Sequence, residues 1–84
     1  MLILVEEIKG SKVLLNTDKI ARVVETFPTK IEDLVRIVAY LDHSDEAVVF
    51  NKVAYTYHDQ SVEFKQIKSL TDFYLYLSEM QNQN

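Results

Sequence analysis

The sequence predicts a small α+β domain, with a mainly antiparallel sheet of five to six strands and one C-terminal helix. Three observations predict this class. The chain is rich in Val and Ile, whose β-branched side chains fit a pleated sheet better than a helix. Short apolar runs alternate with polar turn segments. A stripe of apolar residues at helical spacing follows Ser69. Because 84 residues are too few for two cores, we expect a single domain over 1–84, with 81–84 as a frayed tail.

Three strands are predicted in the N-terminal part. Leu2–Ile8 is the first strand, and its first half is apolar on both faces and therefore expected to be buried on both. Gly10, the only glycine, can adopt a positive φ in the turn that follows. Val13–Asn16 then returns antiparallel. Residues 16–18 (Asn-Thr-Asp) can bond their own backbone, which predicts a short turn or one helical turn before a third strand over Ile20–Phe27.

The segment after Pro28 fits two predictions. Thr29 and Glu32 match a helix capping box, and apolar residues follow at helical spacing. Leu34–Leu41 is also a nearly continuous apolar run with several β-branched residues, which lowers helix propensity. We favour a strand over Leu34–Leu41, preceded by a loop at 31–33, and keep an additional helix at about 29–42 as the alternative.

Two or three further strands are predicted before the helix. Ala47–Phe50 and Val53–His58 are apolar runs, and Asn51-Lys52 between them is either a tight turn or the middle of one strand. Polar turn residues follow His58. Val62–Ile67 then alternates apolar and polar side chains, as a half-buried strand does.

The C-terminal helix is predicted from its cap and its apolar stripe. Ser69 is the expected N-cap, and Asp72 lies three residues on, where a helix N-terminus favours negative charge. Tyr76 lies off the stripe, so we expect the helix to present a second contact surface there. The stripe predicted to face the core consists of Leu70, Phe73, Tyr74, Leu77 and Met80.

Both ends of the chain resemble a known family. The opening strand, the Gly turn, Val13-Leu14-Leu15-Asn16 and Val23-Val24-Glu25 resemble the start of small bacterial FlbD-type proteins of flagellar and swarming motility, and of similar small phage or mobile-element proteins. The extended segment Val62–Lys68 with the Ser69 helix is similar to their ending. The resemblance covers about Leu2–Glu25 and Val62–Leu77. It implies a regulatory or assembly-linked protein that acts by binding others and has no catalytic residues.

Composition narrows the possible partners and compartments. Lys and Arg number 9 against 13 Asp and Glu, a net charge of −4, and the basic residues are scattered. Nucleic acid is therefore disfavoured as an electrostatic partner, because phosphate binding needs clustered positive charge. The absence of cysteine suits a reducing compartment. No segment approaches the roughly 20 apolar residues of a membrane span, and none resembles a signal peptide, so we expect a cytoplasmic protein.

No motif predicts catalysis, a metal or a cofactor. His43 and His58 lie in predicted turns and lack the short spacings of paired metal ligands. The adjacent carboxylates of Glu6-Glu7 would point to opposite faces of a strand, and those of Asp45-Glu46 lie in a turn. An enzyme is the least favoured class, and no metal or cofactor is expected.

The remaining class is a non-enzymatic protein-binding module with a regulatory or assembly role. The small size of the chain, its acidity and its lack of motifs suit a phage or mobile-element protein that acts on a host protein. Homodimerisation through a strand edge or the helix is expected as well. The predicted protein contacts are Glu6, Glu7, Asp42, Asp45, Glu46, Asp59 and Tyr76. The alternative is a single-stranded nucleic-acid-binding module that stacks bases on Tyr55, Tyr57 and Phe64.

Overall fold

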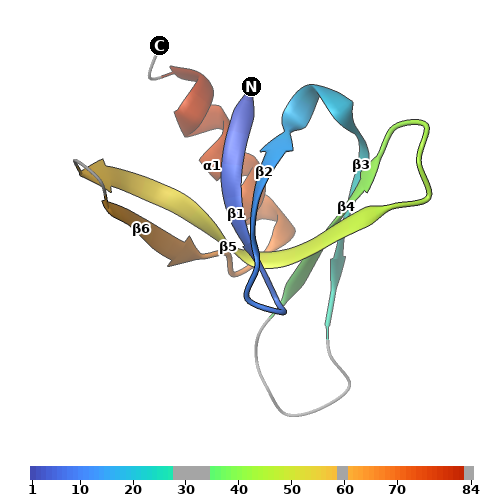
Figure 1. Ribbon diagram of the computed structural model, residues 1–84, viewed down its shortest axis with the longest axis horizontal. Coiled ribbons are helices and arrows are strands. Elements are labelled where there is room, and N and C mark those ends of the chain that lie inside the picture. Colours follow the sequence, from blue (N-terminus) through green and yellow to red (C-terminus); the bar gives the residue numbers. More distant parts are fainter. Residues whose placement is uncertain (28–34, 59–60, 83–84) are drawn as a thin grey trace.

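The computed structural model describes residues 1–27, 35–58 and 61–82. Within them, an antiparallel sheet of six strands packs against one helix, which confirms the predicted α+β class (Figure 1). The elements are β1 (Leu2–Glu7), β2 (Lys12–Asn16), a 3₁₀ turn (Thr17–Lys19), β3 (Ile20–Thr26), β4 (Arg36–Leu41), β5 (Ala47–His58), β6 (Ser61–Gln66) and α1 (Leu70–Asn82). The helix includes two residues of the tail that we expected to fray.

The long strand β5 holds the sheet together, because three strands pair with it. The path runs β2-β1-β5-β4-β3, and β6 adds to the second half of β5. The β1–β5 register passes from Lys52 to Phe50 and skips Asn51, whose carbonyl accepts the Ile67 N–H at 2.7 Å. Such a bulge bends a strand, and β5 curves across the whole width of the molecule in Figure 1. Asn51-Lys52 is therefore the middle of one strand and not a turn.

The ambiguous segment forms a strand where it is described. β4 occupies Arg36–Leu41 and pairs with β3 on one side and β5 on the other. Ile37 and Ala39 are fully buried in this central position. The additional helix at about 29–42 is therefore wrong over 36–42, since burial between two strands favours the β-branched residues. Residues 28–34, with the expected capping box and loop, lie outside the described part.

The core lies between the inner face of the sheet and α1. Ile3 and Val5 of β1, Phe50 and Val53 of β5, and Phe73 of α1 are at most 2% exposed. The rings of Phe50 and Phe73 meet edge to face, with centroids 5.3 Å apart. This aromatic pair fixes the helix to the centre of the sheet.

The face of α1 that packs on the sheet differs from the predicted one. Tyr76 is 5% exposed and its hydroxyl donates a hydrogen bond to the Ala54 carbonyl at 2.8 Å, whereas Tyr74 is 66% exposed. The expectation that Tyr76 lies on an outer contact surface is therefore wrong. A tyrosine can be buried when its hydroxyl has a partner, and the backbone of β5 provides one here.

The predicted cap of α1 is confirmed. Ser69 Oγ accepts the Asp72 N–H at 3.0 Å, and the Asp72 carboxylate accepts the Lys68 N–H at 3.0 Å. A third bond comes from β3, where the Glu25 carboxylate accepts the Leu70 N–H at 2.6 Å. The start of the helix is thus fixed to β3. At 13 residues, α1 is the only helix longer than one turn in the described part, and it does not meet the length and apolarity needed to cross a membrane.

Removing this cap is expected to destabilise the fold. Ser69→Ala should lower the free energy of unfolding by about 1 kcal/mol, the usual cost of losing an N-cap hydroxyl. The measurement is urea unfolding followed by circular dichroism. Ser78→Ala, the same change inside α1, is the matched control and should be neutral or slightly stabilising, since alanine is the better helix former. Equal effects of the two changes would contradict the capping role.

Candidate protein-binding site

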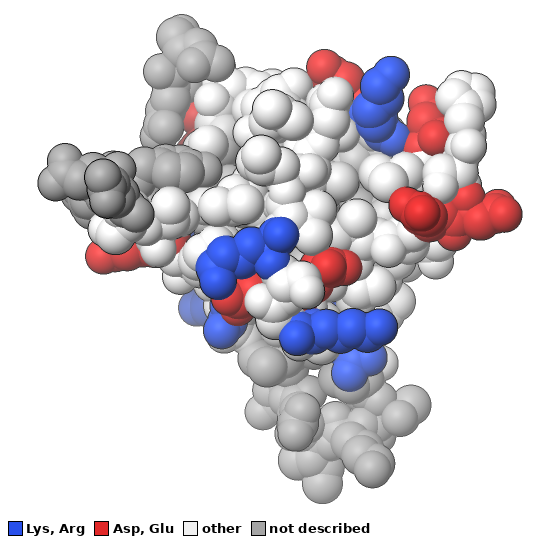
Figure 2. Space-filling model, in the orientation of Figure 1, with Lys and Arg blue, Asp and Glu red and all other residues white. Residues whose placement is uncertain are grey.

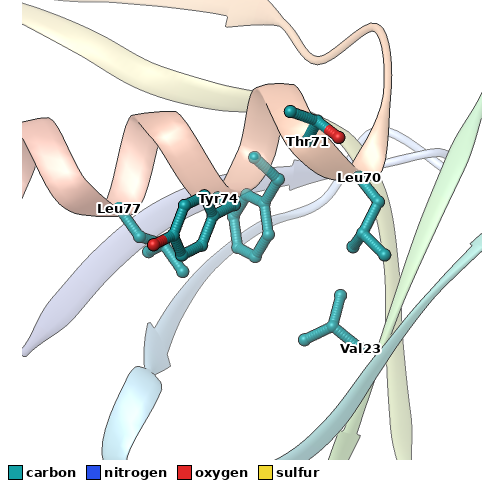
Figure 3. A pocket seen from close by; sticks show the side chains of 6 residues that line it. Val23, Leu70, Thr71, Tyr74 and Leu77 are labelled. Atoms are coloured by element: carbon teal, nitrogen blue, oxygen red, sulfur yellow. The ribbon is translucent and has the colours of Figure 1, made fainter.

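An open apolar groove lies between α1 and β3. Its volume is about 410 Å³, within the range of roughly 300–1,000 Å³ typical of ligand sites. Figure 3 shows Val23 of β3 facing the helix, with Leu70 and Leu77 along the opposite wall. The lining residues are Val23, Leu70, Thr71, Phe73, Tyr74 and Leu77. Apart from two hydroxyls, these side chains offer only apolar surface.

The two walls of the groove are held in place by the fold. Val23 is opposite Ala39 in the β3–β4 register, and Ala39 is fully buried, so Val23 is on the inner face of the sheet. The Glu25–Leu70 hydrogen bond holds the start of α1 next to the same strand. Phe73 anchors the helix to Phe50 one turn later. These two contacts hold α1 to β3 and to β5, and they set the two walls of the groove beside each other.

A free strand edge borders the groove. Within the described residues β3 pairs only with β4, so its other edge has no strand beside it. An unpaired edge presents a row of N–H and C=O groups to which another chain can bind as an added strand. Sites that combine such an edge with side-chain pockets are a recurring mode of peptide recognition.

The face of β1 and β2 turned away from α1 is also partly apolar. Leu4 is opposite Leu14 in the β1–β2 register; Leu14 is 65% exposed and Leu2 60%. The expectation that the first half of β1 is buried on both faces is therefore wrong, because α1 covers one face only. Figure 2 shows an area of uncharged residues in the upper middle of this view, with charged groups below it and to its right.

The predicted acidic contacts do not form one cluster. Glu6 lies between Lys12 and Lys52, at 3.9 and 3.6 Å, so its charge is already balanced. The exposed residues Asp42, Asp45 and Glu46 lie in the turn between β4 and β5. Glu7 is half-buried at the end of β1, and Asp59 lies outside the described residues. No three metal-ligating side chains come together in the described part.

The predicted base-stacking residues are not brought onto one surface. Phe64 is opposite Ala54, on the face with Lys52, whereas Tyr55 lines a small pocket of about 160 Å³ beside α1 on the other face. A lysine Nζ lies near each ring, Lys65 at 5.0 Å from Tyr55 and Lys12 at 5.7 Å from Phe64. The Tyr57 side chain lies outside the described ones.

Comparison with family models, curated proteins and solved structures gives no match to this chain. The resemblance to FlbD-type proteins therefore stays a prediction. The groove residues were not among the sequence candidates. The sequence did contain one indication of the groove. Apolar residues occupy more of the circumference of α1 than packing on one face of the sheet can cover, so some of them must face another surface.

Proposed function

We propose that this chain is a non-enzymatic, cytoplasmic protein-binding module with a regulatory or assembly role, and that it binds an extended segment of a partner protein. The observation that carries the proposal is the position of the apolar groove beside the unpaired edge of β3. Self-association, and an origin in a phage or mobile element with a host protein as the partner, belong to the same proposal.

The partner segment would add to the sheet as a strand next to β3. Alternate side chains of a strand point to the same face, so every second residue of the segment would point toward α1. Those residues are expected to be apolar, because the groove offers apolar side chains and a lone charge would lose its hydration there. The backbone bonds would give affinity and the groove would select the sequence.

The proposal predicts which peptides the protein binds and which substitution weakens that binding. Selection from a random-peptide library should enrich extended segments with apolar residues at alternate positions. Tyr74→Glu places a charge in the groove at a side chain that is 66% exposed, so the fold should tolerate it. We expect it to weaken binding of the selected peptides by about tenfold or more, measured by calorimetry.

Leu75→Glu is the matched control, since Leu75 is the neighbouring residue, 55% exposed, and outside the groove. It should change the dissociation constant less than Tyr74→Glu does. Equal effects of the two substitutions, or no enriched peptide, would contradict the groove as the binding site. Oligonucleotide binding that is lost in Tyr55→Ala would instead favour the nucleic-acid alternative.

A further inference from the structure

Besides the terminal strands β2 and β3, β6 also has an unpaired edge in the described part of the chain. Within the described residues this strand pairs only with β5. The Ile67 N–H donates to Asn51, and Lys52 is opposite Gln66. In an antiparallel ladder the bonding direction alternates along the strand, so the backbone groups of residues 63, 65 and 67 point to β5. Those of Val62, Phe64 and Gln66 point to the free edge. The irregularity at residues 54–56 lies on β5 and leaves this alternation along β6 unchanged.

We propose that two copies of the chain pair through their β6 edges, antiparallel, with the two-fold axis at Phe64. Phe64 of each copy would then exchange both backbone hydrogen bonds with Phe64 of the other, and Val62 would do the same with Gln66. Between these hydrogen-bonded pairs, Glu63 of one copy would lie directly opposite Lys65 of the second copy. The two-fold symmetry gives this pair twice. Both side chains are exposed. The two sheets would become one continuous sheet.

Charge complementarity selects this register. A shift of one residue places outward-pointing backbone groups opposite inward-pointing ones, so the hydrogen bonds cannot form. A shift of two residues in one direction places Glu63 opposite Glu63, and in the other direction Lys65 opposite Lys65. Like charges directly opposite each other destabilise a strand pair, whereas opposite charges and aromatic pairs stabilise it. Of the registers compared, only the one centred on Phe64 places opposite charges opposite each other.

The same pairing would extend the apolar outer face. Phe64 is partly buried on that face, and the Lys12 Nζ lies 5.7 Å from its ring. Two Phe64 rings would meet across the axis and shield each other from water. This inference deepens the self-association part of the proposed function, and it uses a different strand edge from the groove beside β3.

A charge swap tests the register. Lys65→Glu and Glu63→Lys each create two like-charge pairs, and each is expected to weaken the dimer by about tenfold, measured by sedimentation equilibrium. The double variant E63K/K65E restores opposite charges in the same register and should recover most of the affinity. It also keeps the net charge of the original chain, so recovery cannot come from a change in overall repulsion.

Three outcomes would overturn the inference. The first is a chain that stays monomeric at millimolar concentration, and the second is a dimer that neither single substitution weakens. The third is a double variant that is no tighter than the single ones. Peptide binding at the groove should be unchanged in all three variants, and Tyr74→Glu should leave the dimer constant unchanged, so failure of one surface is distinguishable from failure of the other.

Discussion

Phe73→Ala is expected to remove about 3–5 kcal/mol from the free energy of unfolding, the usual cost of truncating a buried phenylalanine. The ring is 2% exposed and contacts both Phe50, at 5.3 Å between centroids, and Tyr76, at 6.2 Å. It is the main apolar anchor of α1 on the sheet. Because small domains have a total stability of roughly 5–15 kcal/mol, this loss should leave the protein close to unfolding.

Urea unfolding at 25 °C measures this effect, followed by circular dichroism. Leu75→Ala is the control, since it removes an apolar side chain from the same helix that is 55% exposed. It should change stability by about 0.5 kcal/mol or less. A Phe73→Ala variant as stable as the Leu75→Ala variant would contradict the position of the helix on the sheet.

Tyr76→Ala is expected to have the second largest effect, about 3 kcal/mol or more, because it removes a buried ring and leaves the Ala54 carbonyl without its donor. Tyr76→Phe separates the two contributions. It keeps the ring and loses only the hydroxyl, so we expect a cost of about 1–2 kcal/mol. Thermal and urea unfolding of both variants give the two values.

Tyr74→Ala is the control for the orientation of the helix. The sequence predicts that Tyr74 faces the core and Tyr76 does not, and the structure shows the opposite exposure, 66% against 5%. Tyr74→Ala should therefore cost much less than Tyr76→Ala. The reverse order would mean that the helix buries the face predicted from the sequence.

The features that were predicted well depend on local chemistry. Gly10 adopts a positive φ of 99° in the first turn, and residues 17–19 form a single 3₁₀ turn after Asn16, whose side chain accepts the Asp18 N–H. The Ser69 cap has the predicted partner. In each case the residues that fix the backbone lie within a few positions of each other, so the sequence alone contains the relevant interaction.

The features that were missed depend on tertiary contacts. The stripe on α1 could be drawn through Tyr74 or through Tyr76, and the choice depends on the Ala54 carbonyl, 22 residues away from Tyr76. Asn51 interrupts an apolar run, so the sequence fits both a tight turn at Asn51-Lys52 and the middle of one strand, and local chemistry does not decide between them. Asn51 lies within β5 because β1, β4 and β6 all pair with this strand, and their hydrogen bonds keep it extended through Asn51. The groove was missed because it is formed by two elements that are distant in the sequence.

The candidate sites show the same difference between features that depend on local sequence and features that depend on tertiary contacts. Acidic and aromatic residues are visible in a sequence, yet the structure places Glu6 between two lysines and puts Tyr55 and Phe64 on opposite faces. The free edges of β3 and β6 are visible only once strand order is known. Charge complementarity between Glu63 and Lys65 then becomes informative, because the direction of each backbone group fixes which registers are possible.

The claim that two copies of this domain pair through the backbone of an edge strand is tested most directly by disulfide crosslinking across β6. The chain has no cysteine, so every crosslink formed by the variants Glu63→Cys and Lys65→Cys is assignable. In the proposed register these positions are a non-hydrogen-bonded pair, with Cα atoms about 4.5 Å apart, a separation that a disulfide can span.

We predict that oxidation of an equimolar mixture of the two variants gives a crosslinked heterodimer, and that neither variant crosslinks efficiently alone. Efficient crosslinking of Glu63→Cys alone would mean that the register is shifted by two residues in one direction. Efficient crosslinking of Lys65→Cys alone would mean a shift of two residues in the other direction. Either result would contradict the proposed register. No crosslink in any sample would contradict pairing through β6.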